Sequence, residues 1–121
     1  MATYNNQTCV TLEAGADLSA KQFFFVSVSS DGQIDPTGDG AYAAGVLQND
    51  PSAAGRAAKV CTSGITKVYC GGVVTRGGPV ASDANGKAVN AATGDVILGE
   101  ALETGADGSV ISIIFHPRGT A

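Results

Sequence analysis

The residues of this chain that could do nucleophilic or acid–base chemistry are few and stand far apart. The only histidine, His116, follows the last apolar segment and lies beside Pro117 and Arg118. A serine or cysteine nucleophile needs a histidine or an equivalent base within hydrogen-bonding reach. Because His116 sits at the end of the chain's final predicted strand, we interpret it as an exposed or interface residue.

Carboxylates in two loops are the other candidates for chemistry. Asp35 and Asp39 share one glycine-rich loop, and Glu103 and Asp107 share another. Paired carboxylates can run acid and base chemistry when burial separates their pKa values, which would make the chain a small hydrolase. Without nearby aromatic residues to form a sugar platform, we favour solvated loop charges, and the sequence predicts no enzyme.

A metal or cofactor site finds equally little support. Asp83, Asn85 and Gly86 reproduce part of the spacing of a calcium-binding loop, but small and apolar residues replace the chelating glutamate around residues 89–93. The glycines at residues 38–40 do not follow a strand and open a helix, as a phosphate-binding loop would. We therefore interpret residues 83–86 as a hairpin turn and predict no metal and no cofactor.

Three cysteines, Cys9, Cys61 and Cys70, are an odd number without a Cys-x-x-Cys pair. A predicted two-residue turn at residues 63–64 would hold Cys61 and Cys70 several residues apart across a hairpin, which excludes a disulfide between them. We expect three reduced thiols, most of them buried as small hydrophobic side chains.

Size and composition indicate one domain that depends on neighbours. The chain has 121 residues and a mass of 12.0 kDa, which is enough for one core. It contains 17 glycines and only 15% charged residues, so small side chains fill little core volume per residue. Such a chain is expected to finish burying its apolar surface against partners.

Charge and hydropathy exclude two classes of partner. The net charge is −4 and the seven Lys and Arg residues are scattered singly, so there is no basic stripe for nucleic acid. No stretch approaches the roughly 18 apolar residues of a membrane span, and the first residues do not resemble an export signal. We expect a protein that is made in a cytoplasm and has no membrane partner.

The elements that would position these residues read as short strands. Residues 1–8 are polar and predict an extended N-terminal arm. Residues 21–29 form the most strand-like segment, with apolar residues on both faces, and residues 111–115 are nearly as apolar on both faces. Further strands are expected at residues 8–12, 41–48, 57–61, 65–70, 73–75, 80–88 (as a hairpin), 95–102 and 109–115.

The chain also repeats itself. Gly40 and Gly94, Gly45 and Gly99, and Val26 and Val80 are each 54 residues apart, and a one-residue slip then aligns residues 57–60 with 110–113. This periodicity indicates two copies of one β unit, about residues 21–61 and 75–115, within a single domain of residues 9–121.

No stretch of ten residues shows a helical period, so we predict an all-β fold, a small barrel or sandwich built from these two units and an N-terminal arm. The two units should superpose over residues 26–60 and 80–113, with Gly45 and Gly99 at equivalent bends. The expected core consists of apolar strand residues: Phe23, Phe25, Val46, Ile97, Ile111 and Ile113.

Four ordered motifs resemble the small capsid decoration, or cement, proteins of tailed bacteriophages. They are LEAGADLSAKQF, GVLQNDPSAAG, GGVVTRGGPVASDANGKA and GDVILGEALETGADGSVISIIF, and the resemblance covers residues 8–115. It implies a virion protein without catalytic residues that binds the outer face of the assembled head and reinforces it, commonly as a homotrimer.

The partners implied by the resemblance are the major capsid protein and further copies of the chain. We expect interface contacts from the arm, from the strand face of the first aromatic segment and from the tail: Thr3, Tyr4, Asn5, Asn6, Phe24 and His116. The alternative from another class is a freestanding adhesion or carbohydrate-binding β module, which would need exposed aromatic residues on loops.

Overall fold

The computed structural model describes residues 7–121 as an all-β protein, in agreement with the predicted fold class. Its strands are β1 (Gln7–Ala14), β2 (Phe25–Val28), β3 (Gln33–Pro36), β4 (Gly45–Leu47), β5 (Ala57–Tyr69), β6 (Pro79–Ser82), β7 (Ala88–Asn90), β8 (Gly99–Ala101) and β9 (Val110–Phe115). A single 3₁₀ turn, Ser30–Gly32, connects β2 to β3. The strands form one sheet in the order β1-β3-β2-β4-β5-β9-β8-β6-β7, and β1 also pairs with β5, which closes part of the sheet into a ring.

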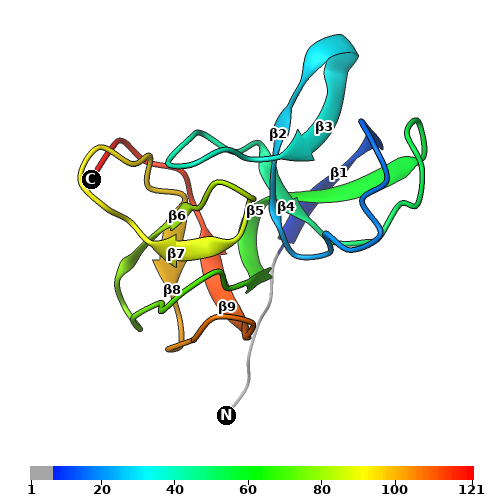
Figure 1. Ribbon diagram of the computed structural model, residues 1–121. Helices are drawn as coiled ribbons and strands as arrows, with labels where there is room; N and C mark the ends of the chain where they lie inside the picture. Colours follow the sequence, from blue (N-terminus) through cyan, green and yellow to red (C-terminus); the bar gives the residue numbers. More distant parts are fainter. Residues whose placement is uncertain (1–6) are drawn as a thin grey trace.

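The pairing register repeats at the offset found in the sequence. Val26 on β2 pairs with Gly45 on β4, and Val80 on β6 pairs with Gly99 on β8. The β2–β3 ladder and the β6–β7 ladder also correspond at 54 residues, from Val28↔Ile34 in the first to Ser82↔Ala88 in the second. The two units therefore have the same strand order, as the repeat predicts, and Figure 1 shows them on either side of β5.

The structural repeat is longer than the predicted one, because β1 has a counterpart in the second half of β5. Ala14 at the end of β1 makes a parallel pair with Ile34, and Cys70 just after β5 makes a parallel bridge with Ala88. The next residue repeats the hydrogen bond as well: Gly15 N donates to Ile34 O and Gly71 N donates to Ala88 O. We call β1–β4 with residues 57–61 the first unit, and residues 64–70 with β6–β9 the second unit.

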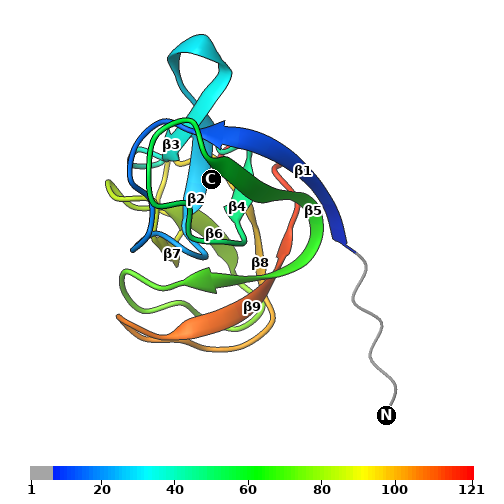
Figure 2. The same cartoon turned by 90° about the vertical axis from the view of Figure 1, so that its right-hand side faces the viewer.

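Strand β5 belongs to both units. The predicted turn at Ser63 and Gly64 is therefore wrong. The chain does not reverse there but continues as one strand of 13 residues. Gly64 has φ +100°, so the strand bends without turning back. On either side of the bend β5 changes neighbours, from β1 and β4 to β9, as Figure 2 shows.

The glycines at the predicted bends have equivalent surroundings. A Cβ atom on Gly45 would collide with the carbonyl oxygen of Cys61, and one on Gly99 would collide with that of Ile114. Cys61 and Ile114 are themselves counterparts in the two units. Only glycine lets each short strand approach its neighbour so closely, which explains why both positions hold glycine.

Two groups of buried side chains make up the core. The larger is centred on the second unit and includes Phe25, Val46, Ile111, Ile113 and Phe115, and the smaller lies within the first unit around Leu18, Ile34 and Val60. Four of the six predicted core residues, Phe25, Val46, Ile111 and Ile113, are buried as expected.

The other two, Phe23 and Ile97, are only partly buried. Phe23 has φ +69°, a left-handed conformation that ends the predicted alternation, so β2 begins at Phe25 and not at residue 21. Ile97 precedes β8, and its neighbour Leu98 takes the buried position instead. Residues 41–48 and 95–102 likewise contain shorter strands than predicted, because only three residues of each pair with a neighbouring strand.

The predicted arm lies mostly outside the described residues. Its last two residues, Gln7 and Thr8, already belong to β1, where they pair with Gly64 and Ser63. The arm prediction for residues 1–6 concerns residues that the structure does not describe.

Candidate interaction surface

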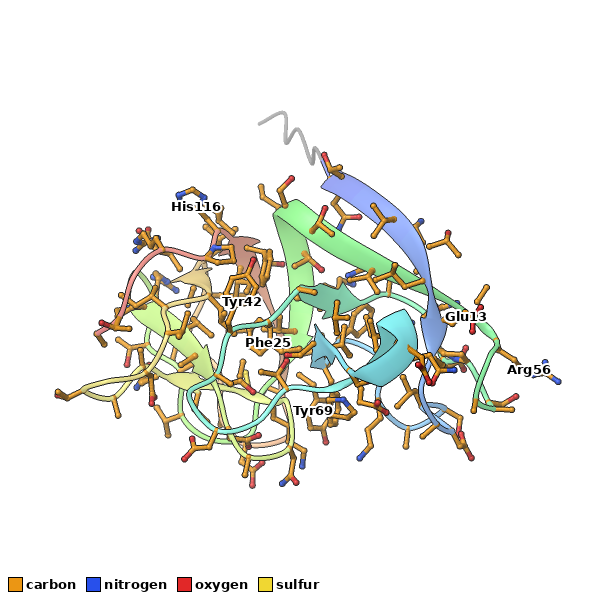
Figure 3. All side chains as sticks on the ribbon, turned by 90° about the horizontal axis from the view of Figure 1, so that it is seen from above. Glu13, Phe25, Tyr42, Arg56, Tyr69 and His116 are labelled. Atoms are coloured by element: carbon orange, nitrogen blue, oxygen red, sulfur yellow. The ribbon has the colours of Figure 1, made fainter. Side chains whose placement is uncertain are left out.

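Each candidate for chemistry serves a local structural purpose or faces solvent. His116 is exposed and follows the last residue of β9, and Figure 3 shows it at the opposite end of the molecule from Glu13 and Arg56. Asp39, Glu103 and Asp107 are exposed as well. Within residues 7–121 there is no cavity and no group of three side chains suited to hold a metal ion.

The segment with partial calcium-loop spacing is a hairpin turn. Asp83 Oδ1 accepts hydrogen bonds from the backbone N–H groups of Asn85 at 2.8 Å and Lys87 at 2.9 Å. Gly86 has φ +85°, which a tight turn of this kind needs. The carboxylate is therefore used to shape the turn between β6 and β7.

An exposed apolar surface lies on the outside of the second unit. β9 turns Ile111, Ile113 and Phe115 into the core, so Val110 and Ile114 point outward, where they are 46% and 39% exposed. An antiparallel strand with one wet face normally carries polar residues on that side. Two of the three outward positions of β9 are apolar instead.

Neighbouring strands extend this apolar surface. Register pairs share a face, so Tyr69 and Ile65 on β5 lie outward beside Val110 and Ile114. Leu102 follows β8, hydrogen-bonds to Ser112 through its N–H group and is 41% exposed. We call the surface made by these five apolar residues the outer face: Ile65, Tyr69, Leu102, Val110 and Ile114.

Charged groups lie within and around the outer face. Lys67 projects between Ile65 and Tyr69, opposite Ser112. Glu100 forms an ion pair with Arg118 at 2.7 Å, and Glu103 accepts a hydrogen bond from Ser112 N at 3.0 Å. The outer face thus combines exposed apolar side chains with one central cation and acidic groups along its edge, a composition suited to binding another protein surface.

A cationic cluster borders the same surface at Tyr69. Lys21 Nζ lies 5.2 Å from the ring centre of Phe24, and Lys87 Nζ lies 5.9 Å from Phe24 and 5.5 Å from Tyr69. These are cation–π distances, and the two rings are 5.4 Å apart. Lys21 comes from the first unit and Lys87 from the second, so the cluster links the two units at the edge of the outer face.

The predicted interface residues have different surroundings. Thr3, Tyr4, Asn5 and Asn6 lie outside the described residues. Phe24 is only 4% exposed, because Tyr69 and the two lysines cover its ring, so the surface at this position belongs to those side chains and not to Phe24. His116 is exposed, two residues beyond Ile114.

Val110, Ile114 and Leu102 were not among the predicted interface residues. The available signal was the last strand, residues 110–115, in which apolar residues occupy both alternating faces. The predicted burial of Ile111 and Ile113 already implied that Val110 and Ile114 face outward, but the predicted interface did not include them.

The three cysteines are free, as expected. Cys61 and Cys70 are buried, and burial raises the pKa of both thiols. Cys9 is half-buried on β1.

Comparisons with known proteins match this chain to phage structural proteins. A family model described as phage cement protein matches residues 3–115. Among solved structures, the head fiber gp8.5 N base of bacteriophage phi29 is similar over 96% of this chain and 98% of that chain, with a TM-score of 0.72 and 18% sequence identity. At that identity the similarity concerns the fold alone. No curated protein sequence matches the chain, and within residues 7–121 no helix is long and apolar enough to cross a membrane.

Proposed function

Because this chain belongs to the phage cement protein family and is a structural protein of the virion, we propose that it binds the outer surface of the assembled head and stabilises it. The family match over residues 3–115 carries this proposal. The partner on the shell is the major capsid protein, and synthesis takes place in the host cytoplasm. A ligand that binds the assembled shell and not its separate subunits shifts the balance toward the shell by mass action.

The chain acts as a homotrimer, and the outer face of the second unit packs against the next copy. The exposure of Val110, Ile114 and Leu102 supports this assignment. Lys67 in one copy is matched to the acidic edge, Glu100 and Glu103, of its neighbour. A closed ring buries the apolar surface of every copy and leaves no sticky edge for further growth.

The N-terminal arm makes the additional contacts with the shell. The residues Thr3, Tyr4, Asn5 and Asn6 precede β1 in the sequence, and a span of up to about 3.3 Å per residue lets such a segment reach a neighbouring surface. His116 also contacts the shell. These contacts add binding free energy at each of many sites, so a modest interface is sufficient.

Mixing purified protein with undecorated expanded heads tests the proposal. After the heads are pelleted, we expect the protein in the pellet at a saturable ratio, and the decorated heads should withstand heating better than bare ones. Protein that stays in the supernatant at all concentrations would contradict head binding. Deleting residues 2–7 should weaken attachment and leave the trimer intact, and unchanged head binding by this variant would remove the role of the arm.

The alternative of an adhesion or carbohydrate-binding module is not favoured. Such modules stack sugars on exposed aromatic rings, and within residues 7–121 Tyr42 alone is an exposed aromatic residue. A single ring in the loop between β3 and β4 does not make a binding platform.

A further inference from the structure

Two of the three cysteines face each other across the β1–β5 ladder. Cys9 and Cys61 are register partners in this antiparallel pair, next to the Val10↔Val60 pair. Residues directly opposite in antiparallel strands have Cα atoms about 4.5–5.5 Å apart and side chains on the same side of the sheet. A disulfide needs Cα atoms about 4.4–6.8 Å apart, a range that includes the usual spacing of register partners. The register shift of this ladder lies between Thr8 and Cys9, so Cys9↔Cys61 belongs to the regular run of pairs that continues to Glu13↔Ala57.

The surroundings of the two thiols differ. Cys61 is fully buried and its Sγ donates a weak hydrogen bond to Ser63 O at 3.2 Å. Cys9 is partly exposed, and its Sγ donates to Gln7 Oε1 at 3.6 Å. An oxidant in solution therefore reaches Cys9 first, and Cys61 lies opposite Cys9 on β5. Cys70 lies in the larger core group, in the second unit, and does not compete.

The pKa of the Cys61 thiol agrees with this closeness. Burial raises it most, and the neighbouring Cys9 raises it further, because two thiolates side by side would repel each other. The Cys61 thiol therefore remains protonated at neutral pH.

The position of the pair in the fold gives a bond there a structural consequence. β1 pairs with β5 over seven register pairs but pairs with β3 only through Glu13 and Ala14, at its C-terminal end. Within residues 7–121, β5 is therefore the only strand that pairs with the half of β1 that contains Cys9. We propose that Cys9 and Cys61 form a disulfide when the protein meets an oxidant, which fixes the free end of β1 on β5.

The step proceeds by thiol–disulfide exchange with a low-molecular-weight disulfide such as oxidised glutathione. The Cys9 thiolate attacks one sulfur of the oxidant, which forms a mixed disulfide and releases one glutathione thiol. The Cys61 thiolate then attacks the Cys9 sulfur and releases the second glutathione thiol. Two protein thiols are oxidised to one disulfide, and one oxidant disulfide is reduced to two thiols.

A biological setting for this bond rests on the proposed function. A virion protein is made in a reducing cytoplasm and is later released into oxidising surroundings. The bond would then form after assembly and hold β1, from which the N-terminal arm continues, in its assembled position. The chemistry itself can be tested on the free protein, so its failure can be told apart from a failure to bind heads.

The test treats the purified full-length protein with oxidised glutathione at mildly alkaline pH, followed by thiol counting after denaturation. We expect the count to fall from three to one, with Cys9 and Cys61 joined in one peptide in the digest. Cys70→Ala should still form the bond, whereas Cys9→Ser should retain both remaining thiols. Retention of all three thiols, a bond to Cys70, or only bonds between separate chains would overturn the proposal.

Thermal unfolding supplies a second readout. Closing a loop of about 50 residues restricts the unfolded chain, so oxidised protein should melt at least about 5 °C above reduced protein. Cys9→Ser should show no difference between the two conditions. An oxidised form that melts at or below the reduced form would show that the bond does not fit the native strand pair. Head binding measured under reducing conditions tests the proposed function separately.

Discussion

The two units share one backbone plan, yet their outward surfaces differ. In the first unit the outward positions of β1 and β5 include Thr11, Glu13 and Lys59, and the apolar residue Val46 on β4 is buried in the larger core group. In the second unit the counterparts of Thr11 and Glu13 are Lys67 and Tyr69, and Val110 replaces Ala57. At these positions the first unit has polar, small or covered side chains, whereas the second unit exposes apolar ones; the exposed valines of the first unit, Val10 and Val28, lie elsewhere on its strands.

This difference distinguishes the residues that the fold needs from the residues that bind a partner. The same arrangement of strands is stable with polar or small outward residues in the first unit, so the fold does not require apolar residues at those positions. Their presence in the second unit, at 39% to 46% exposure for Val110, Ile114 and Leu102, points to a partner outside the chain. The first unit serves as an internal control for the second.

The largest expected effect concerns the shared backbone plan. Gly45→Ala and Gly99→Ala should each destabilise the protein by at least about 4 kcal/mol, because the added Cβ would collide with a backbone carbonyl in both units. Chemical denaturation of the two variants measures this. Similar large losses would sharpen the equivalence of the units, and a mild effect in one alone would break it.

Core truncation should come next in size. Ile113→Ala removes a fully buried side chain from the larger core group and should cost about 2–5 kcal/mol. Val60 is the counterpart of Ile113 and is equally buried in the smaller group. Because valine is the smaller side chain, Val60→Ala should cost less. A reversed order in urea denaturation would mean that the smaller group dominates stability.

Gly77→Ala, in a turn that both units share, should lower the free energy of unfolding by about 1 kcal/mol. Phe23 has φ +69° and its counterpart Gly77 has φ +78°, and both N–H groups donate to the equivalent residue, Leu47 O or Ala101 O. No atom lies within 4 Å of a Cβ placed on Gly77, so Gly77→Ala introduces backbone strain alone. A loss of unfolding free energy above about 3 kcal/mol would show that this position holds glycine because a side chain does not fit there, and not because of its positive φ.

The smallest effect is expected in a loop. Asp39 is exposed, and Asp39→Ala should change the free energy of unfolding by no more than about 0.5 kcal/mol. If this substitution destabilised the protein more than Ile113→Ala does, the interpretation of the loop acids as solvated charges would be wrong.

The sequence predicted the parts of the fold that carry a local signal. The spacing of Gly45 and Gly99 revealed the repeat, and the register bears out its strand order. The role of β1 was missed because its counterpart lies in the second half of β5, where a glycine bend at Gly64 resembles a hairpin turn. Whether Gly64 bends or reverses the strand depends on β1 and β9 pairing on either side of it.

The candidate surface was predicted less completely. The sequence shows that residues 110–115 are apolar on both faces of the strand. How exposed each side chain is depends on which other parts of the chain pack against it. Phe24 illustrates this, because its burial depends on Lys87 and Tyr69, which come from distant parts of the chain. Phe23 has a positive φ, which is typical of glycine, and the alternation of apolar and polar residues does not predict this conformation.

The most direct test of the account compares Val110→Glu with Ala57→Glu by analytical ultracentrifugation at micromolar concentration. The two residues are counterparts, both are exposed, and each substitution should leave the unfolding free energy nearly unchanged. We predict that the wild type and Ala57→Glu sediment as trimers and that Val110→Glu sediments as a monomer, because the new carboxylate would be buried unpaired in the interface. A monomeric wild type, or a Val110→Glu variant that remains trimeric, would contradict the assignment of the outer face.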